Sequence, residues 1–313
     1  MIVAHMSLTY GLFSFNSVER NPFFVWMSFF MTYFYISSGY LFSCKKGTKE
    51  YIINKIDKLI IPYLFWTAVS LVVFYTYEYI TIGEISWKSP FKPIFVTGAV
   101  ASDTPLWFLF SLFAVTIIYY IVSKYTRYIH VFIILCFLFA FLVHNKTQIL
   151  GWGNISLGLV YFHLGHMFRS ISEKKYVAHW VTLVVALIVY ISIGVLYSQD
   201  MAFVTLYVRQ GSFVCNLIWS VSACYVLWYI SRYVKCIRPI NWIGLNSLTI
   251  YASHRIILNW IYDPTIRFVY DEIPYYEYIT IGGGVILFTS IVMFYTLKRF
   301  CPRVLGIKNK KLV

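Results

Sequence analysis

The stretch GLNSLTIYASHRIILNW, residues 244–260, carries an ionisable pair inside an apolar run. His254 and Arg255 stand side by side in its middle, and ionisable groups inside a membrane are costly and usually functional. Helical spacing aligns Ser247, Tyr251 and His254 on one stripe, and Arg255 lies on its flank. The pattern predicts a polar face on this helix, and the role of this face has two possible interpretations. It lines a reaction cavity, or it holds helices together by hydrogen bonds.

A second histidine, His5, lies in the first apolar run, MIVAHMSLTYGLFSF. This run is short for a membrane span, and no basic residue precedes it, so we expect the full gene product to have further residues upstream. His5 then lies near the middle of the membrane, where a histidine needs a partner or a function. The alternative is a histidine near a frayed chain end that faces water.

Lys55 and Lys58 stand one turn apart in the sequence KIDK, just before another apolar run. Two ammonium groups at this spacing suit the phosphates of an anionic cytosolic ligand. The same charges also suit an anchor on the cytoplasmic side of a membrane, and spacing alone does not decide between these roles.

His163 and His166 stand one turn apart in FHLGH, a spacing that can hold a metal ion. No third ligand of comparable character stands near them in the sequence, so we favour a structural role and expect no metal site. The six cysteines form no CxxC pair, and we interpret them as small apolar residues.

The composition identifies the environment of these residues. Hydrophobic residues make up 60% of the 313 residues and charged residues 12%, whereas soluble domains carry about 25% charged residues. We therefore predict an all-α, polytopic membrane bundle that forms one domain over 1–313, with a truncated first span. About ten spans are predicted, at 1–15, 22–43, 58–78, 105–123, 128–144, 150–168, 177–197, 212–231, 242–261 and 275–297.

The positive charges follow the topology of these spans. The net charge is +14, and most of the 26 lysines and arginines lie in alternate loops and in the tail. This bias predicts that the basic side is cytoplasmic and faces anionic lipid. The positive charge is then explained without binding to nucleic acid. The loop 79–104 then lies outside. We expect this loop, with Trp107 directly after it, to help enclose an external substrate.

Five stretches occur in an order that resembles the acyltransferase 3 family, whose members are integral membrane proteins of bacteria. The resemblance covers essentially the whole chain and rests on the ordered set rather than on one motif. The stretches are YFYISSGYLF (33–42), KLIIPYLFW (58–66), PLWFLFSLF (105–113), VYFHLGHMFR (160–169) and IGLNSLTIYASH (243–254).

The resemblance implies an activity and its residues. Family members move acyl groups, usually acetyl, from a cytoplasmic acyl donor to extracytoplasmic or lipid-linked glycans. The family's catalytic histidine in the first span corresponds to His5, and its C-terminal polar stripe to Ser247, Tyr251 and His254. Its basic pair is usually two arginines. Lys55 and Lys58 keep the charge but lack the bidentate fork.

Two functions compete. The first is a multi-pass O-acyltransferase of the bacterial inner membrane, most simply an O-acetyltransferase. It binds no cofactor and uses acyl-CoA as donor substrate. His5 and His254 act as catalytic residues, because a glycan hydroxyl is a weak nucleophile that needs a base. Lys55, Lys58, Trp107, Ser247, Tyr251 and Arg255 bind substrate. The second is a transporter or flippase of a lipid-linked glycan, which predicts a symmetry between halves that the sequence does not display.

Overall fold

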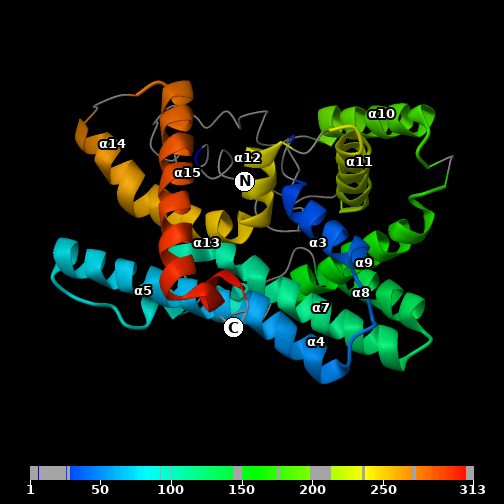
Figure 1. Ribbon diagram of the computed structural model, residues 1–313, viewed down its shortest axis with the longest axis horizontal. Coiled ribbons are helices and arrows are strands. Elements are labelled where there is room, and N and C mark those ends of the chain that lie inside the picture. Colours follow the sequence, from blue (N-terminus) through cyan, green and yellow to red (C-terminus); the bar gives the residue numbers. More distant parts are fainter. Residues whose placement is uncertain are drawn as a thin grey trace. The chain divides into compact units, whose positions relative to one another are not determined.

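The computed structural model of the chain is built from helices (Figure 1). It describes residues 6, 26, 29–91, 93–99, 101–143, 150–174, 177–197, 213–234, 237–269 and 273–307. Within these ranges every regular element is a helix and no strand occurs, which confirms the predicted all-α class.

Long apolar helices account for much of the described chain. Side chains exposed on several of them are large and apolar, such as Leu142 on the helix Ile129–Val143 and Leu196 on the helix Trp180–Tyr197. Such outward faces suit lipid, because a helix satisfies its own backbone groups there. The described helices are those of a multi-pass membrane protein. Four are long and apolar enough to cross a membrane: Thr48–Ile82, Trp107–Tyr125, Phe213–Ser231 and Tyr275–Phe300.

The chain folds into two compact units. Unit 1 comprises Met1–Glu19, Tyr51–Phe113 and Ile237–Val313, and unit 2 comprises Arg20–Glu50 and Ala114–Cys236. The division falls inside two continuous helices, α4 (Thr48–Lys55) and α7 (Trp107–Tyr125). That residues 1–313 form a single domain stays a prediction.

Unit 1 contains the predicted external loop and the C-terminal quarter of the chain. Helix α13 packs against α15 and η3, and α5 packs against η3 and η6. Its elements after α4 are η1 (Ile56–Ile60), α5 (Ile61–Ile82), η2 (Ser89–Phe91), α6 (Ile94–Thr97), η3 (Ala101–Leu106), α12 (Arg238–Leu245), α13 (Ser247–Ile257), η5 (Leu258–Tyr262), α14 (Asp263–Val269), α15 (Tyr275–Phe300) and η6 (Pro302–Leu305).

An apolar cluster joins α15 to the segment that follows α13. Met6, Tyr262 and Tyr278 are buried in it, and the Tyr262 hydroxyl donates to the carbonyl of Tyr278 at 2.6 Å. Gly282 has no room for a side chain, because an added Cβ would meet Met6 and Tyr262. Met6 is the described residue of the predicted span 1–15, and it packs here.

The predicted span 242–261 is wrong as one helix. Helix α12 ends at Leu245, and Asn246 separates it from α13. The Asn246 backbone N–H and its side-chain amide both donate to the carbonyl of Trp242, at 3.0 and 2.7 Å. Asparagine side chains compete for backbone groups in this way, and they interrupt helices by doing so. Beyond α13 the helical path continues through η5 and α14 to Val269.

Unit 2 is organised around α9. Helices α3 and α8 both pack against α9, and α11 packs against α10 and α3. Gly39 of α3 and Gly165 of α9 allow a close crossing, since an added Cβ at either would overlap the opposing backbone. Small residues serve this purpose between membrane helices. The elements not yet delimited are α3 (Phe30–Tyr40), α8 (Ile129–Val143), α9 (Trp152–Ile171), α10 (Trp180–Tyr197) and α11 (Phe213–Ser231).

Candidate active site

The predicted polar stripe on α13 faces the interior of unit 1. Tyr251 is 5% exposed and His254 is fully buried, whereas Ser247, at the start of the helix, is partly buried. The prediction that this face turns inward is confirmed for its two larger members. A reaction cavity and a structural hydrogen-bond stripe would both bury these side chains. The contacts of each side chain are therefore needed to decide between the two interpretations.

His254 is held in one tautomer by its own helix. Its Nδ1 lies 2.5 Å from the carbonyl oxygen of Tyr251. Because a carbonyl oxygen only accepts, Nδ1 must carry the hydrogen and donate it. In the neutral ring Nε2 then carries the lone pair. An imidazole in this state can take a proton or a hydrogen bond from a hydroxyl, as a base or an orienting group does.

Tyr251 ties α13 to η3. Its hydroxyl donates to the carbonyl of Pro105, and its ring packs edge-on against Phe108 with centroids 5.7 Å apart. Ser253, which is also on α13, shares a hydrogen bond of 2.9 Å with Ser290 of α15. These two bonds hold α13, the helix that carries His254, against η3 and α15.

Arg255 has an acidic neighbour that the sequence did not indicate. Asp103 of η3 is fully buried, and burial raises the pKa of its carboxyl while the positive charge of Arg255 lowers it. Arg255 itself is partly buried. The burial effect is the larger of the two, so the pKa of Asp103 stays well above its usual value. An arginine inside an apolar bundle requires a polar partner, and Asp103 is the acidic residue whose carboxyl interacts with it. The sequence therefore indicated that Arg255 needs an acidic partner, but it did not identify which acid this is.

Trp107 begins α7 directly after η3. It is 3% exposed, and its indole Nε1 has no hydrogen-bond partner. Pro105 and Phe108, which lie close to it in the chain, both contact Tyr251. The predicted substrate residue Trp107 therefore lies beside the α13 contact.

Lys55 and Lys58 lie where α4 gives way to the π-helical segment η1. The Lys55 ammonium lies 5.4 Å from the centre of the Tyr51 ring, a cation–π geometry, and Lys58 is exposed. Gly306, with φ of +69°, approaches both the backbone of Lys58 and the side chain of Leu248 on α13. The C-terminal segment thus connects the lysine pair to the start of the histidine helix.

Unit 1 contains every predicted site residue that the structure describes. Two π-helical segments adjoin them, η1 at Lys58 and η5 directly after α13. Such segments are rare and occur frequently at functional sites. His5 lies outside the described residues, so its predicted role stays a prediction. The described members are Lys55, Lys58, Trp107, Ser247, Tyr251, His254 and Arg255.

Unit 2 holds a separate histidine cluster. The Tyr119 hydroxyl lies 2.8 Å from Nδ1 of both His163 and His166, and His130 Nδ1 lies 3.1 Å from His163 Nε2. His130 comes from α8, and its contact with His163 was not predicted. Among the described residues no three His, Cys, Asp or Glu side chains are arranged to hold a metal ion. The cluster is a hydrogen-bonded chain that joins α7, α8 and α9.

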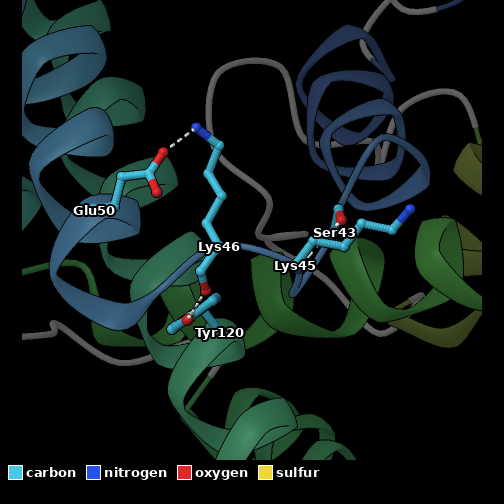
Figure 2. A network of polar contacts seen from close by, with 5 residues as sticks. All are labelled: Ser43, Lys45, Lys46, Glu50 and Tyr120. Atoms are coloured by element: carbon cyan, nitrogen blue, oxygen red, sulfur yellow. Dashed lines mark hydrogen bonds and ion pairs between the residues drawn. The ribbon is translucent and has the colours of Figure 1, made fainter.

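The basic loop before α4 is fixed within unit 2 (Figure 2). The Tyr120 hydroxyl donates to the carbonyl of Lys46 at 2.7 Å, and the Lys46 ammonium pairs with Glu50 at 2.6 Å. Figure 2 shows the Lys45 side chain pointing away from this network. The ion pair is exposed and contributes little to stability because water screens it, whereas Tyr120 is buried and its hydrogen bond holds the shape of the loop.

Comparisons with known proteins identify the family of the chain. Neither the curated proteins nor the solved structures give a match. The model of the acyltransferase 3 family, described as an acyltransferase domain, matches residues 1–297. This range includes His254 and every other predicted site residue, so the resemblance seen in the sequence is confirmed. The chain belongs to the acyltransferase 3 family and is a membrane acyltransferase.

Proposed function

We propose that the protein moves an acyl group, most simply acetyl, from cytoplasmic acyl-CoA to a hydroxyl of a cell-surface or lipid-linked glycan. The bacterial inner membrane is the setting, since that is where such a donor and acceptor meet. The observation that carries the proposal is the buried His254, whose Nδ1 is occupied by a backbone carbonyl and whose Nε2 carries the lone pair. A histidine in this state suits a reaction in which a hydroxyl must lose its proton.

The reaction needs a base, a leaving group and a binding site for each substrate. The acceptor oxygen attacks the thioester carbonyl, a carbon–oxygen bond forms, and the carbon–sulfur bond breaks. The hydroxyl proton passes to the base and then to the departing thiolate of CoA. All atoms are thereby accounted for, without a metal or a redox cofactor in the scheme.

The residues divide between these tasks. The family resemblance supports His5 as the general base. His254 is the group that orients the acceptor hydroxyl through Nε2, with Arg255, Ser247 and Trp107 around the acceptor. Lys55 and Lys58 bind the donor's phosphates through charge alone, because lysine does not make the bidentate contacts of arginine.

Mass spectrometry of the surface glycan, from cells with and without the gene, tests the proposal. We expect an ester of acetyl mass that is present only with the gene and is removed by mild alkali. Complementation by His254→Ala should restore less of the ester than the wild-type gene does. Identical glycan masses with and without the gene would refute the proposal.

A further inference from the structure

Unit 2 contains a chain of hydrogen bonds that the acyl-transfer scheme does not use. The Tyr119 hydroxyl lies 2.8 Å from Nδ1 of both His163 and His166, and Nε2 of His163 lies 3.1 Å from Nδ1 of His130. Each of these contacts holds one hydrogen, because a hydrogen bond joins one donor to one acceptor. The positions of these hydrogens therefore determine the tautomer of every ring in the chain.

The hydrogens of the chain fit in two arrangements of neutral rings. In the first, His166 donates from Nδ1 to Tyr119, and Tyr119 donates to Nδ1 of His163. Nε2 of His163 then donates to Nδ1 of His130. In the second arrangement the direction of every bond is reversed. The two arrangements differ at the outer nitrogens, since Nε2 carries a hydrogen on His130 in the first and on His166 in the second.

Exchange between the two arrangements carries a proton along the chain. A proton binds to the lone pair at Nε2 of His166, and the hydrogen in each contact moves from its donor to its acceptor. Nε2 of His130 then releases its hydrogen as a proton. The numbers of N–H and O–H bonds are the same before and after, so the step needs no other reactant. Histidine is suited to such proton transfer because it gains and loses a proton near neutral pH.

The same contacts limit the chain to one excess proton. A single excess proton can lie on His130, His163 or His166, and in each case every contact still holds one hydrogen. If any two of these rings were protonated, one contact would hold two hydrogens and would open, because two donors would then face each other. The three rings therefore bind a proton as one unit and not as separate groups.

The burial of the four groups suits a relay. Tyr119 is fully buried and His163 is 8% exposed, whereas His130 is exposed and His166 is partly buried. The outer rings thus have the access to the surface that the inner groups lack. The Tyr119 ring packs edge-on against Phe42, with centroids 5.0 Å apart, and this contact helps to hold its hydroxyl in place.

The other polar groups near the chain leave these contacts intact. Ser123, one turn after Tyr119 on α7, is near enough to act on it, but the Ser123 hydroxyl has no hydrogen-bond partner. Cys44 also acts on Tyr119, and Arg169 of α9 acts on His166. Among the described residues, the hydrogen bonds of the four groups are therefore those of the chain itself.

We infer that the histidine chain, which consists of Tyr119, His130, His163 and His166, is a proton relay. Its imidazoles share one excess proton, which enters and leaves at the two outer rings. In the sequence Arg127 precedes His130, and basic residues also follow His166. The outer rings therefore lie near the end of unit 2 that the positive charges predict to be cytoplasmic, and the cytoplasm supplies the proton.

The test counts the protons that each ring gains in the purified full-length protein in lipid nanodiscs. Histidine rings are labelled with ¹⁵N, whose resonances distinguish the two neutral tautomers from the charged ring. The resonances of His130, His163 and His166 are identified by their loss in single His→Gln variants. From about pH 8 to about pH 5, across the range where an ordinary histidine titrates, these rings should together gain one proton in one shared step. At pH 8 the Nδ1–H fraction of His166 should equal the Nε2–H fraction of His130.

Two variants of α7 separate a relay from a set of independent histidines. Tyr119→Phe removes the hydroxyl that joins the rings, so His166 and the His130–His163 pair should each gain a proton, and the total should rise to two. Ser123→Ala is the matched control on the same helix. It removes a hydroxyl that has no hydrogen-bond partner, so the total should stay at one.

Each outcome decides the inference. Independent titration of the rings in the wild type, with a total well above one, overturns it, and so does a total of one in Tyr119→Phe. A changed total in Ser123→Ala also overturns it, because the Tyr119 hydrogen would then belong to Ser123. If Tyr119→Phe does not fold, His166→Gln replaces it. The remaining two rings should still gain one proton in total, and a total of two would contradict the relay.

Discussion

Removing the Tyr251 hydroxyl separates the packing of its ring from its hydrogen bond. In Tyr251→Phe the ring still packs against Phe108, while the carbonyl of Pro105 loses its donor in a buried position. Leaving a buried acceptor unpaired costs about 1–3 kcal/mol. The carbonyl of residue 251 still accepts from His254, so the tautomer of the imidazole is unchanged. We therefore expect a loss of stability within that range and a correctly oriented His254.

Equilibrium unfolding in mixed detergent micelles measures this loss as a change in the free energy of unfolding. The matched control is Tyr276→Phe on α15, whose side chain is 81% exposed and whose loss of a hydroxyl should change stability by less than about 0.5 kcal/mol. Tyr251→Ala also removes the ring and should cost about 3–5 kcal/mol.

The same variants separate the two interpretations of the stripe. Loosening η3 moves Trp107 away from α13, so Tyr251→Phe should also reduce kcat/KM for the acceptor. A Tyr251→Phe protein as stable as Tyr276→Phe would refute the role given to this hydrogen bond. A destabilised protein with full activity would show that the stripe is structural only.

Three further outcomes are expected. His5→Gln keeps the size of the side chain and loses its basicity, so acyl transfer at matched expression should fall by about 10²–10⁴-fold, and wild-type activity would exclude His5 as the base. Lys55→Ala with Lys58→Ala should raise the KM for acyl-CoA, with Lys45→Ala as control, and an unchanged KM would leave the pair as topology anchors. Gly165→Ala should reduce the yield of folded protein, because its Cβ overlaps the backbone of Ile36 across the α3–α9 contact, and a wild-type yield would contradict that contact.

Local periodicity was enough to predict the buried face of α13. Ser247, Tyr251 and His254 recur at helical spacing, and spacing is a property of a short stretch of sequence. The break at Asn246 was not predicted, since it depends on side-chain competition for the Trp242 carbonyl rather than on hydropathy.

The neighbours of the stripe depend on contacts between distant residues. Asp103 and Arg255 lie far apart in the chain, and only the packing of η3 on α13 brings them together. The contact of His130 with His163 depends in the same way on the packing of α8 on α9. A single sequence contains no signal for such pairs, and so the acid that balances Arg255 could not be named in advance.

Acetyl transfer across the membrane tests the central claim most directly. Inverted membrane vesicles that contain the protein and its glycan are supplied with radiolabelled acetyl-CoA on their outer, cytoplasmic face. Label should enter the glycan as an alkali-labile ester with the wild-type protein, and should be nearly absent with His5→Gln at the same protein level. Glycan that crosses the membrane without acetyl-CoA and without gaining label would contradict the claim and identify a transporter.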